Sequence, residues 1–139
     1  MCRIDASVFD ADGNPVDFIA KYQVMHAAML LDHGSIYIAF CSIAGFEGFT
    51  PYRGWVMKYR ASDLAFQNAF CTSKDGREGR AGIWQGGGGL ASDPDGNVYF
   101  LTVFLETFFL TSRLVEVYKL HNILRMFSHV PQEPGYDYP

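Results

Sequence analysis

Two segments of this chain repeat one another in outline. Residues 30–40 read Leu-Leu-Asp-His-Gly-Ser-Ile-Tyr-Ile-Ala-Phe, and residues 92–102 read Ser-Asp-Pro-Asp-Gly-Asn-Val-Tyr-Phe-Leu-Thr, so that Gly34 matches Gly96, 62 positions later. Similar segments at a nearly fixed spacing are typical of units that bury their apolar faces against copies of themselves. The chain is therefore predicted to be a repeat protein.

A second pair of segments supports the repeat. Residues 54–60 are echoed by residues 113–119, with Tyr59 matched to Tyr118 at a spacing of 59. The residues are 49% hydrophobic and 16% aromatic, with 14 glycines, which suits short twisted strands and tight turns better than a helical bundle. We therefore expect an all-β fold.

Alternating apolar residues separated by turn residues divide the chain into short strands. The first hairpin is expected around Asp-Gly and the second around His-Gly, where glycine adopts a positive φ at little cost. Residues 43–52 contain several Gly and Pro and are expected to form a loop. The predicted strands are 4–9, 16–20, 25–31, 35–42, 54–60, 65–72, 90–92, 97–103, 114–120 and 124–130.

These strands group into four-stranded antiparallel units of the kind that form the blades of a β-propeller. Residues 1–20 are expected to be a hairpin from a preceding blade, residues 21–80 a first full blade and residues 81–130 a second. Residues 131–139 are expected to be a tail. The predicted fold is thus a partial β-propeller built of antiparallel four-stranded blades.

Charge and hydropathy exclude two classes of function. The net charge is −4 and there is no basic stripe, so a nucleic-acid partner is not expected. No run of about 18 apolar residues is present to span a membrane, and the first residues lack the apolar core of a signal peptide. The three cysteines form no Cys-x-x-Cys motif. Buried free thiols are expected, although a disulfide between Cys41 and Cys71 stays open.

Three motifs resemble the pyrroloquinoline-quinone-repeat β-propellers of the quinoprotein-like superfamily. Residues 52–56 read Tyr-Arg-Gly-Trp-Val, residues 82–89 read Gly-Ile-Trp-Gln-Gly-Gly-Gly-Gly, and residues 93–99 read Asp-Pro-Asp-Gly-Asn-Val-Tyr. Members of that superfamily carry Tyr-His-Gly-Trp-Val, Gly-Ile-Trp-Gln-Ser-Gly-Gly and Asp-Gly-Asn-Val-Tyr in the same order. The similarity covers about residues 20–102. It ends where members continue into Thr-Gly-Asn-Gly and this chain has Thr-Val-Phe-Leu from Thr102.

The resemblance implies a ring of about six to eight blades, more than the roughly two and a half blades that this chain supplies. Two arrangements follow from that shortfall: the chain is a fragment or degenerate gene product, or three or four copies close a ring together. A two-sheet β-sandwich is a third option. The expected partners are further propeller blades, in the same or other copies, and a protein or small-molecule ligand. The resemblance also suggests a periplasmic or secreted location.

Three residues are candidates for a ligand site. Trp84 could stack on a flat ligand and Gln85 could orient it, while Arg53 could bind an anionic group. Each has a structural alternative: Trp84 could dock one blade onto the next, and Arg53 could be a surface residue. His26 is expected to be a hydrogen-bonded histidine of a sheet. The run Gly86 to Gly89 is expected to let another backbone approach closely, so that Gly87→Val would weaken folding.

No catalytic residues are predicted. The segment Asp93-Pro-Asp-Gly-Asn97 has the oxygen spacing of half a calcium loop but lacks the closing Glu, so a plain turn is expected. The first hypothesis for function is a non-catalytic binding or scaffolding segment that uses loops 43–53 and 73–89. The alternatives are part of a dehydrogenase that depends on pyrroloquinoline quinone (PQQ) and calcium, with Arg53, Trp84 and Gln85 near the cofactor, and a self-assembling structural protein.

Overall fold

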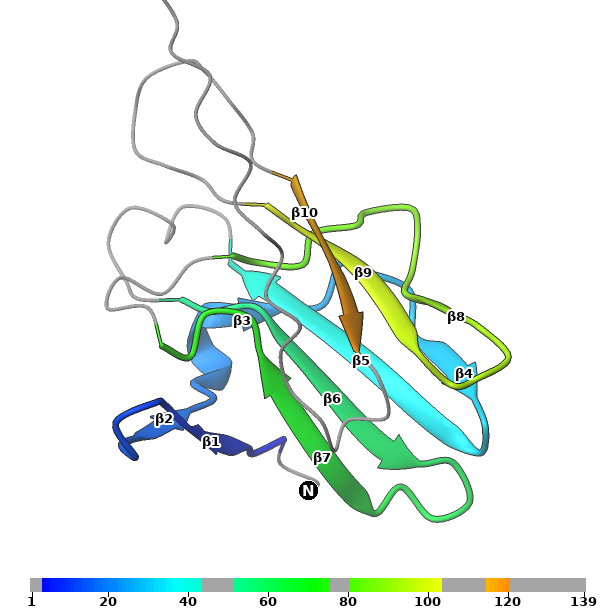
Figure 1. Cartoon of the computed structure of the whole chain (residues 1–139), viewed down its shortest axis with the longest axis horizontal. Coiled ribbons are helices and arrows are strands. Elements are labelled where there is room, and N and C mark those ends of the chain that lie inside the picture. The colour runs from blue at the N-terminus through cyan, green and yellow to red at the C-terminus, as the bar shows by residue number, and fades with distance from the viewer. Residues whose placement is uncertain (1–3, 44–51, 76–80, 104–114, 121–139) are drawn as a thin grey trace, which may run out of the picture.

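The structure, a computed structural model, describes residues 4–43, 52–75, 81–103 and 115–120, and it confirms the all-β class. Antiparallel strands form three sheets (Figure 1), which we name the hairpin layer, the central sheet and the C-terminal sheet. In the described part of the chain the only helical element is the 3-10 turn η1 (Ala20–Tyr22). No helix in these residues is long and apolar enough to cross a membrane.

The hairpin layer consists of β1 (Ser7–Phe9) and β2 (Pro15–Asp17), which confirms the predicted hairpin but with strands shorter than the expected 4–9 and 16–20. Its turn is organised by the Asp10 carboxylate, which accepts hydrogen bonds from the backbone N–H groups of Asp12 and Asn14 at 3.0 and 2.7 Å. Gly13 has a φ of 83°, a conformation that a residue with a side chain rarely adopts. The Asp-x-Asp-Gly-Asn sequence therefore specifies this turn.

The central sheet is a meander of four strands with one further short strand at its edge. Its strands are β4 (Leu30–Asp32), β5 (Ser35–Ser42), β6 (Trp55–Arg60) and β7 (Phe66–Cys71), and β3 (Gln23–Val24) pairs with the end of β5. The hairpins at Gly34 and at 61–65 lie where they were predicted. The predicted strands over 35–42, 54–60 and 65–72 are confirmed.

The predicted strand over 25–31 is wrong for most of its length, because the edge strand beside β5 is interrupted. Gln23 pairs with Ser42 and Leu30 pairs with Tyr37, so residues 25–29 stand opposite only residues 38–40. The surplus residues bulge out of the sheet. There Ala28 donates its N–H to the carbonyl of Gly88 at 2.8 Å and forms a parallel bridge with Gly89. Ala28 therefore pairs with the segment that precedes Ala91, instead of continuing the hydrogen bonds of the edge strand with β5.

The C-terminal sheet consists of β8 (Ala91–Ser92), β9 (Val98–Val103) and β10 (Val115–Leu120), in agreement with three predicted strands. The predicted strand 124–130 and the tail 131–139 lie outside the described residues. Ile36 stands opposite Tyr59, whereas Val98, its repeat equivalent, stands opposite Leu120. The match of Tyr59 with Tyr118 is therefore two residues out of register.

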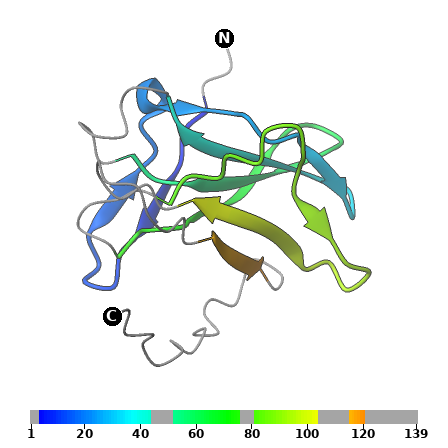
Figure 2. The same ribbon diagram turned by 90° about the horizontal axis from the view of Figure 1, so that it is seen from above.

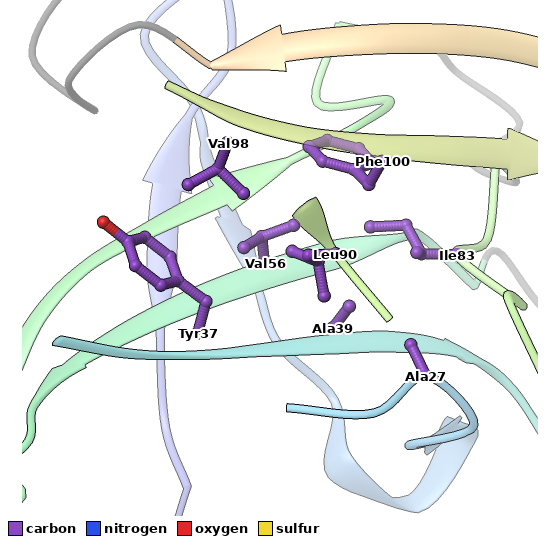
Figure 3. Packing of buried hydrophobic residues seen from close by; sticks show 8 residues of the cluster. All are labelled: Ala27, Tyr37, Ala39, Val56, Ile83, Leu90, Val98 and Phe100. Atoms are coloured by element: carbon purple, nitrogen blue, oxygen red, sulfur yellow. The ribbon is translucent and has the colours of Figure 1, made fainter. Parts of the chain in front are cut away.

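One apolar core lies between the central and C-terminal sheets. Val98 and Phe100 of β9 point toward Tyr37, Ala39 and Val56 of the central sheet (Figure 3). All of these residues are at most 3% exposed. Ala27, Ile83 and Leu90 from the connecting segments complete the cluster. Burial of this face holds the two sheets together.

A second apolar core lies between the central sheet and the hairpin layer. Phe40, Trp55 and Met57 of the central sheet pack against Ala6 and Phe18, which flank the hairpin strands. The Phe18 ring meets Phe40 at 4.9 Å and Trp55 at 5.8 Å between centroids, both edge to face. Phe40 belongs to this core, and its neighbour Ala39 belongs to the first core. Since successive residues of a strand point to opposite faces, the two cores lie on opposite faces of the central sheet.

The three layers stack in the same orientation along the chain, so that equivalent residues of each layer face the layer before it; we call this constant polarity. Ile38 and Phe40 of the central sheet face the hairpin layer, which precedes that sheet in the chain. Their repeat equivalents in β9, Phe100 and Thr102, face the central sheet, which precedes the C-terminal sheet. Val16, two residues after the turn residue Asn14, faces the layer that follows it. In each sheet, the same alternate positions of the repeat thus face the preceding layer, and the positions between them face the layer that follows.

The long connections leave the sheets at a common end. β5, β7 and β9 all end on one side (Figures 1 and 2), at Ser42, Cys71 and Val103. The segments 44–51, 76–80 and 104–114, which follow these strands in the sequence and include most of the predicted loop at 43–52, lie outside the described residues. We call this side, where the three strands end, the loop end. The short turns at His33-Gly34 and Asp93 to Asn97 lie at the opposite end of their strands.

Cys41 and Cys71 are buried and are not joined by a disulfide, so the pairing that the sequence left open is not formed. Cys71 stands opposite Trp55, which stands opposite Phe40, so the side chain of Cys71 lies on the face of Phe40 and packs in the second core. Cys41 is the next residue of β5 and points to the other face. The sheet itself separates the two thiols.

Burial raises the pKa of the Cys71 thiol from 9.0 to about 11. The folded state therefore holds this proton more tightly than the unfolded state, and the resulting stabilisation is complete below pH 9 and is lost as the pH rises through 11. We expect Cys71→Ala to remove up to about 3 kcal/mol of the decline in unfolding free energy over that range. Urea unfolding of both proteins at successive pH values measures this, and identical pH profiles would contradict it.

The glycine run allows a close approach, but not at Gly87. A Cβ on Gly89 would lie 3.0 Å from the carbonyl oxygen of Ala28, whereas nothing lies within 4 Å of one on Gly87. The reason given for the expected effect of Gly87→Val is therefore wrong. The φ of 79° at Gly87 still disfavours valine there. Gly89 is the position at which the run admits another backbone.

Candidate functional site

The segment from Ala81 to Gly89 lies between the central and C-terminal sheets and carries two of the predicted site residues. Ile83 donates its N–H to the carbonyl of Phe40 at 3.3 Å, which attaches the segment to the end of β5. Gly88 donates its N–H to the carbonyl of Gln85 at 3.0 Å and closes a turn. Trp84 and Gln85 are therefore held by backbone contacts near the loop end.

The Gln85 side chain extends the edge of the C-terminal sheet. β8 pairs only with Val98 and Tyr99, so the edge of β9 is open beyond that point. The Oε1 atom of Gln85 accepts the N–H of Leu101 at 3.3 Å, and its Nε2 atom donates to the carbonyl of Gly89 at 3.1 Å. The amide thus stands in for a missing strand and joins the glycine run to β9.

We expect Gln85→Ala to lower the unfolding free energy by about 1–2 kcal/mol, because it leaves two backbone groups without these partners. Gln85→Glu should cost at least as much near neutral pH, since a carboxylate cannot donate to the Gly89 carbonyl. Hydrogen exchange at the Leu101 amide should become faster in Gln85→Ala, which removes its acceptor, whereas Gln85→Glu keeps an acceptor oxygen there. An unchanged exchange rate at Leu101 would contradict this role for Gln85.

Trp84 stacks on His26 of the bulged segment. The two ring centroids are 5.1 Å apart and the planes are inclined by 27°. His26 is exposed and lies outside the strands, so the prediction of a hydrogen-bonded sheet histidine is wrong. The Nε1 atom of Trp84 is buried and has no hydrogen-bond partner among the described residues. Trp84 thus joins the two sheets and leaves one donor unused.

Arg53 is anchored on another part of the loop end. Its guanidinium donates to the backbone carbonyl of Ser73, which follows β7. Nearby, Lys74 pairs with Asp75 at 2.7 Å, and Asp75 accepts the N–H of Ala11 at 2.6 Å. These contacts tie the hairpin layer to the end of β7. The contact that places Arg53 is thus with Ser73, whereas Trp84 and Gln85 contact His26, Gly89 and Leu101.

The predicted turn at Asp93 is confirmed. Its carboxylate accepts the N–H groups of Asp95 and Asn97 at 3.1 and 2.9 Å, the Asn97 side-chain amide at 2.6 Å and the Tyr99 hydroxyl at 2.7 Å. The hydrogen bonds from Asn97 and Tyr99 hold the pKa of Asp93 well below its usual range. The turn repeats that of Asp10, so the two Asp-x-Asp-Gly-Asn sequences are one structural device used twice.

Buried polar atoms without hydrogen-bond partners gather near the loop end. Ser42 is the last residue of β5 and Thr102 is the last but one of β9, and both are fully buried. Gln23 pairs with Ser42 across the strands. Among the described residues, no partner is found for the Oγ of Ser42, the Oγ1 of Thr102, the Oε1 of Gln23 or the Nε1 of Trp84. Such groups are costly when unpaired, so we take this end as the candidate site.

The sequence did not indicate Ser42, Thr102 or Gln23, because their significance depends on burial and on neighbours far along the chain. In the described part of the chain, no three His, Cys, Asp or Glu side chains are placed so that they could hold a metal ion. Comparison with protein-family models, curated proteins and solved structures finds no match to this chain. What it does is therefore argued from its own residues.

Proposed function

We propose that this chain is a non-catalytic binding or scaffolding segment of a quinoprotein-like β-propeller. The observation that carries the proposal is the stacking of three antiparallel layers with constant polarity, in which Phe40 and its repeat equivalent Thr102 both face the preceding layer. Sheets stacked face to face in one direction along the chain are the arrangement that successive propeller blades require. The motifs at 52–56, 82–89 and 93–99 agree with that assignment.

Binding is assigned to the loop end. Strands β5, β7 and β9 end there, the sequence predicts loops after the first two, and loops on a rigid β scaffold are common sites of recognition. At this end, Thr102 offers a hydroxyl on the side of the central sheet that packs on β9, and Trp84 offers an N–H donor. Ser42, two residues after Phe40, lies on the other side of the sheet. Neither Thr102 nor Trp84 carries a charge, so this pair suits a neutral polar or aromatic group.

The alternative of a PQQ-dependent dehydrogenase fits the residues poorly. It requires Arg53, Trp84 and Gln85 to hold the quinone, but both polar atoms of Gln85 are used within the chain and Arg53 bonds to Ser73. The His26 ring stacks on Trp84. These three residues therefore act as structural links in this arrangement, and no catalytic step is derived through them.

Titration of the purified protein with PQQ and calcium chloride separates the two functions. The scaffold predicts neither a change in quinone absorbance nor a shift in the thermal unfolding midpoint, and the dehydrogenase predicts both. A positive test uses nuclear magnetic resonance with a library of neutral polar and aromatic fragments. Shifts should concentrate at Trp84 and Thr102, and hits centred on the turns at Asp10 or Asp93 would overturn the assignment of the loop end.

A further inference from the structure

Among the residues that the structure describes, the outer face of β9 is incompletely covered. Along β9, Val98 and Phe100 point into the first core, so Tyr99 and Leu101 lie on the opposite face. Leu101 is 39% exposed. An apolar side chain in the middle of a sheet face normally packs against another layer.

The repeat shows what covers this face elsewhere in the molecule. Tyr37 and Ala39, which match Tyr99 and Leu101, are 3% and 0% exposed because the C-terminal sheet packs on them. In the hairpin layer, Val16 holds the place of Tyr99 relative to the Asp-x-Asp-Gly-Asn turn, and it packs on the central sheet. In both other layers, the forward face is therefore covered by the layer that follows.

The opposite end of the stack exposes the complementary face. Val8 and Val16 pack toward the central sheet, so Phe9 and Pro15 lie on the outer face of the hairpin layer. Phe9 is 67% exposed. Counted from the turn, Pro15 occupies the place of Val98, a residue that faces the preceding layer and is buried. The backward face is therefore open at this end.

We propose that a second copy of this chain docks its hairpin layer, through Phe9 and Pro15, on the C-terminal sheet at Tyr99 and Leu101. This contact has the same orientation as the two interfaces within the chain. Each copy carries both surfaces of the contact, one on its hairpin layer and one on its C-terminal sheet. Such a contact is head to tail, so it closes into a ring or grows into a filament. The inference rests on the layered scaffold proposed above and identifies its partner.

Sedimentation velocity over increasing concentration tests this with four proteins. The wild type should self-associate, whereas Leu101→Glu and Phe9→Glu, each of which blocks one half of the contact, should remain monomeric. Leu64→Glu changes a residue that is 63% exposed in a hairpin turn on neither face, and it should associate like the wild type.

An equimolar mixture of Leu101→Glu and Phe9→Glu gives the sharpest result. Each variant keeps the half that the other lacks, so the mixture should form a one-to-one pair that grows no further. A wild type that stays monomeric would overturn the inference, as would a mixture that forms no pair. Circular dichroism confirms that each variant is folded. A folded monomer refutes the docking alone, whereas fragment binding away from the loop end refutes the proposed function alone.

Discussion

Gly54→Ala is expected to lower the unfolding free energy by about 3 kcal/mol, a large effect for one methyl group. A Cβ at this position would overlap the carbonyl oxygen of Ala81 and lie 2.7 Å from the Oγ1 of Thr72. Thr72 cannot swing aside freely, because its hydroxyl hydrogen-bonds to the carbonyls of Gly54 and Ala81 at 3.2 and 2.8 Å. Equilibrium unfolding in urea measures the loss.

Gly86→Ala is the matched control for this substitution. Gly86 lies in the segment that Ala81 begins, but the nearest atom to its added Cβ would be 3.8 Å away, and its φ is not positive. Its unfolding midpoint should therefore stay close to that of the wild type. Equal midpoints for Gly54→Ala and Gly86→Ala would show that the chain segments at Gly54 and Ala81 are not in contact.

Trp55→Ala is expected to cost about 3–5 kcal/mol. Trp55 is 1% exposed, and its ring fills the second core between the central sheet and Phe18. Because that core joins the hairpin layer to the central sheet, amide exchange in β1 and β2 should accelerate more than in β9. Trp55→Phe keeps part of the apolar contact and should cost less than half as much. A loss below about 1 kcal/mol for Trp55→Ala would contradict the packing.

The strands and turns were largely predictable because their rules are local. Asp-x-Asp-Gly-Asn at 10–14 and His-Gly at 33–34 supply backbone conformations and side-chain oxygens that fix a hairpin within a few residues. Alternating apolar residues along 35–42 and 54–60 then indicated strands there. The bulge at 25–29 was missed because its cause is the pairing of Ala28 with Gly89, far away in the sequence.

The candidate site was less predictable for the same reason. Trp84 and Gln85 were found from a motif, but what they touch depends on His26 and Leu101, which other segments supply. The contact of Arg53 with Ser73 spans 20 residues. Residue type indicated which side chains could act, whereas only the arrangement of the sheets shows which of them already hold the fold together.

The constant polarity of the three layers is tested most directly by nuclear Overhauser effects on the full chain with labelled methyl and aromatic groups. The structure predicts contacts of Phe100 with Phe70 in one core, and contacts of Phe18 with Trp55 and Phe40 in the other. It predicts none between Phe100 and Trp55, which lie on opposite sides of the central sheet. Cross-strand contacts between the backbones of Ile36 and Val98, which would place β5 and β9 in one continuous sheet, would contradict it.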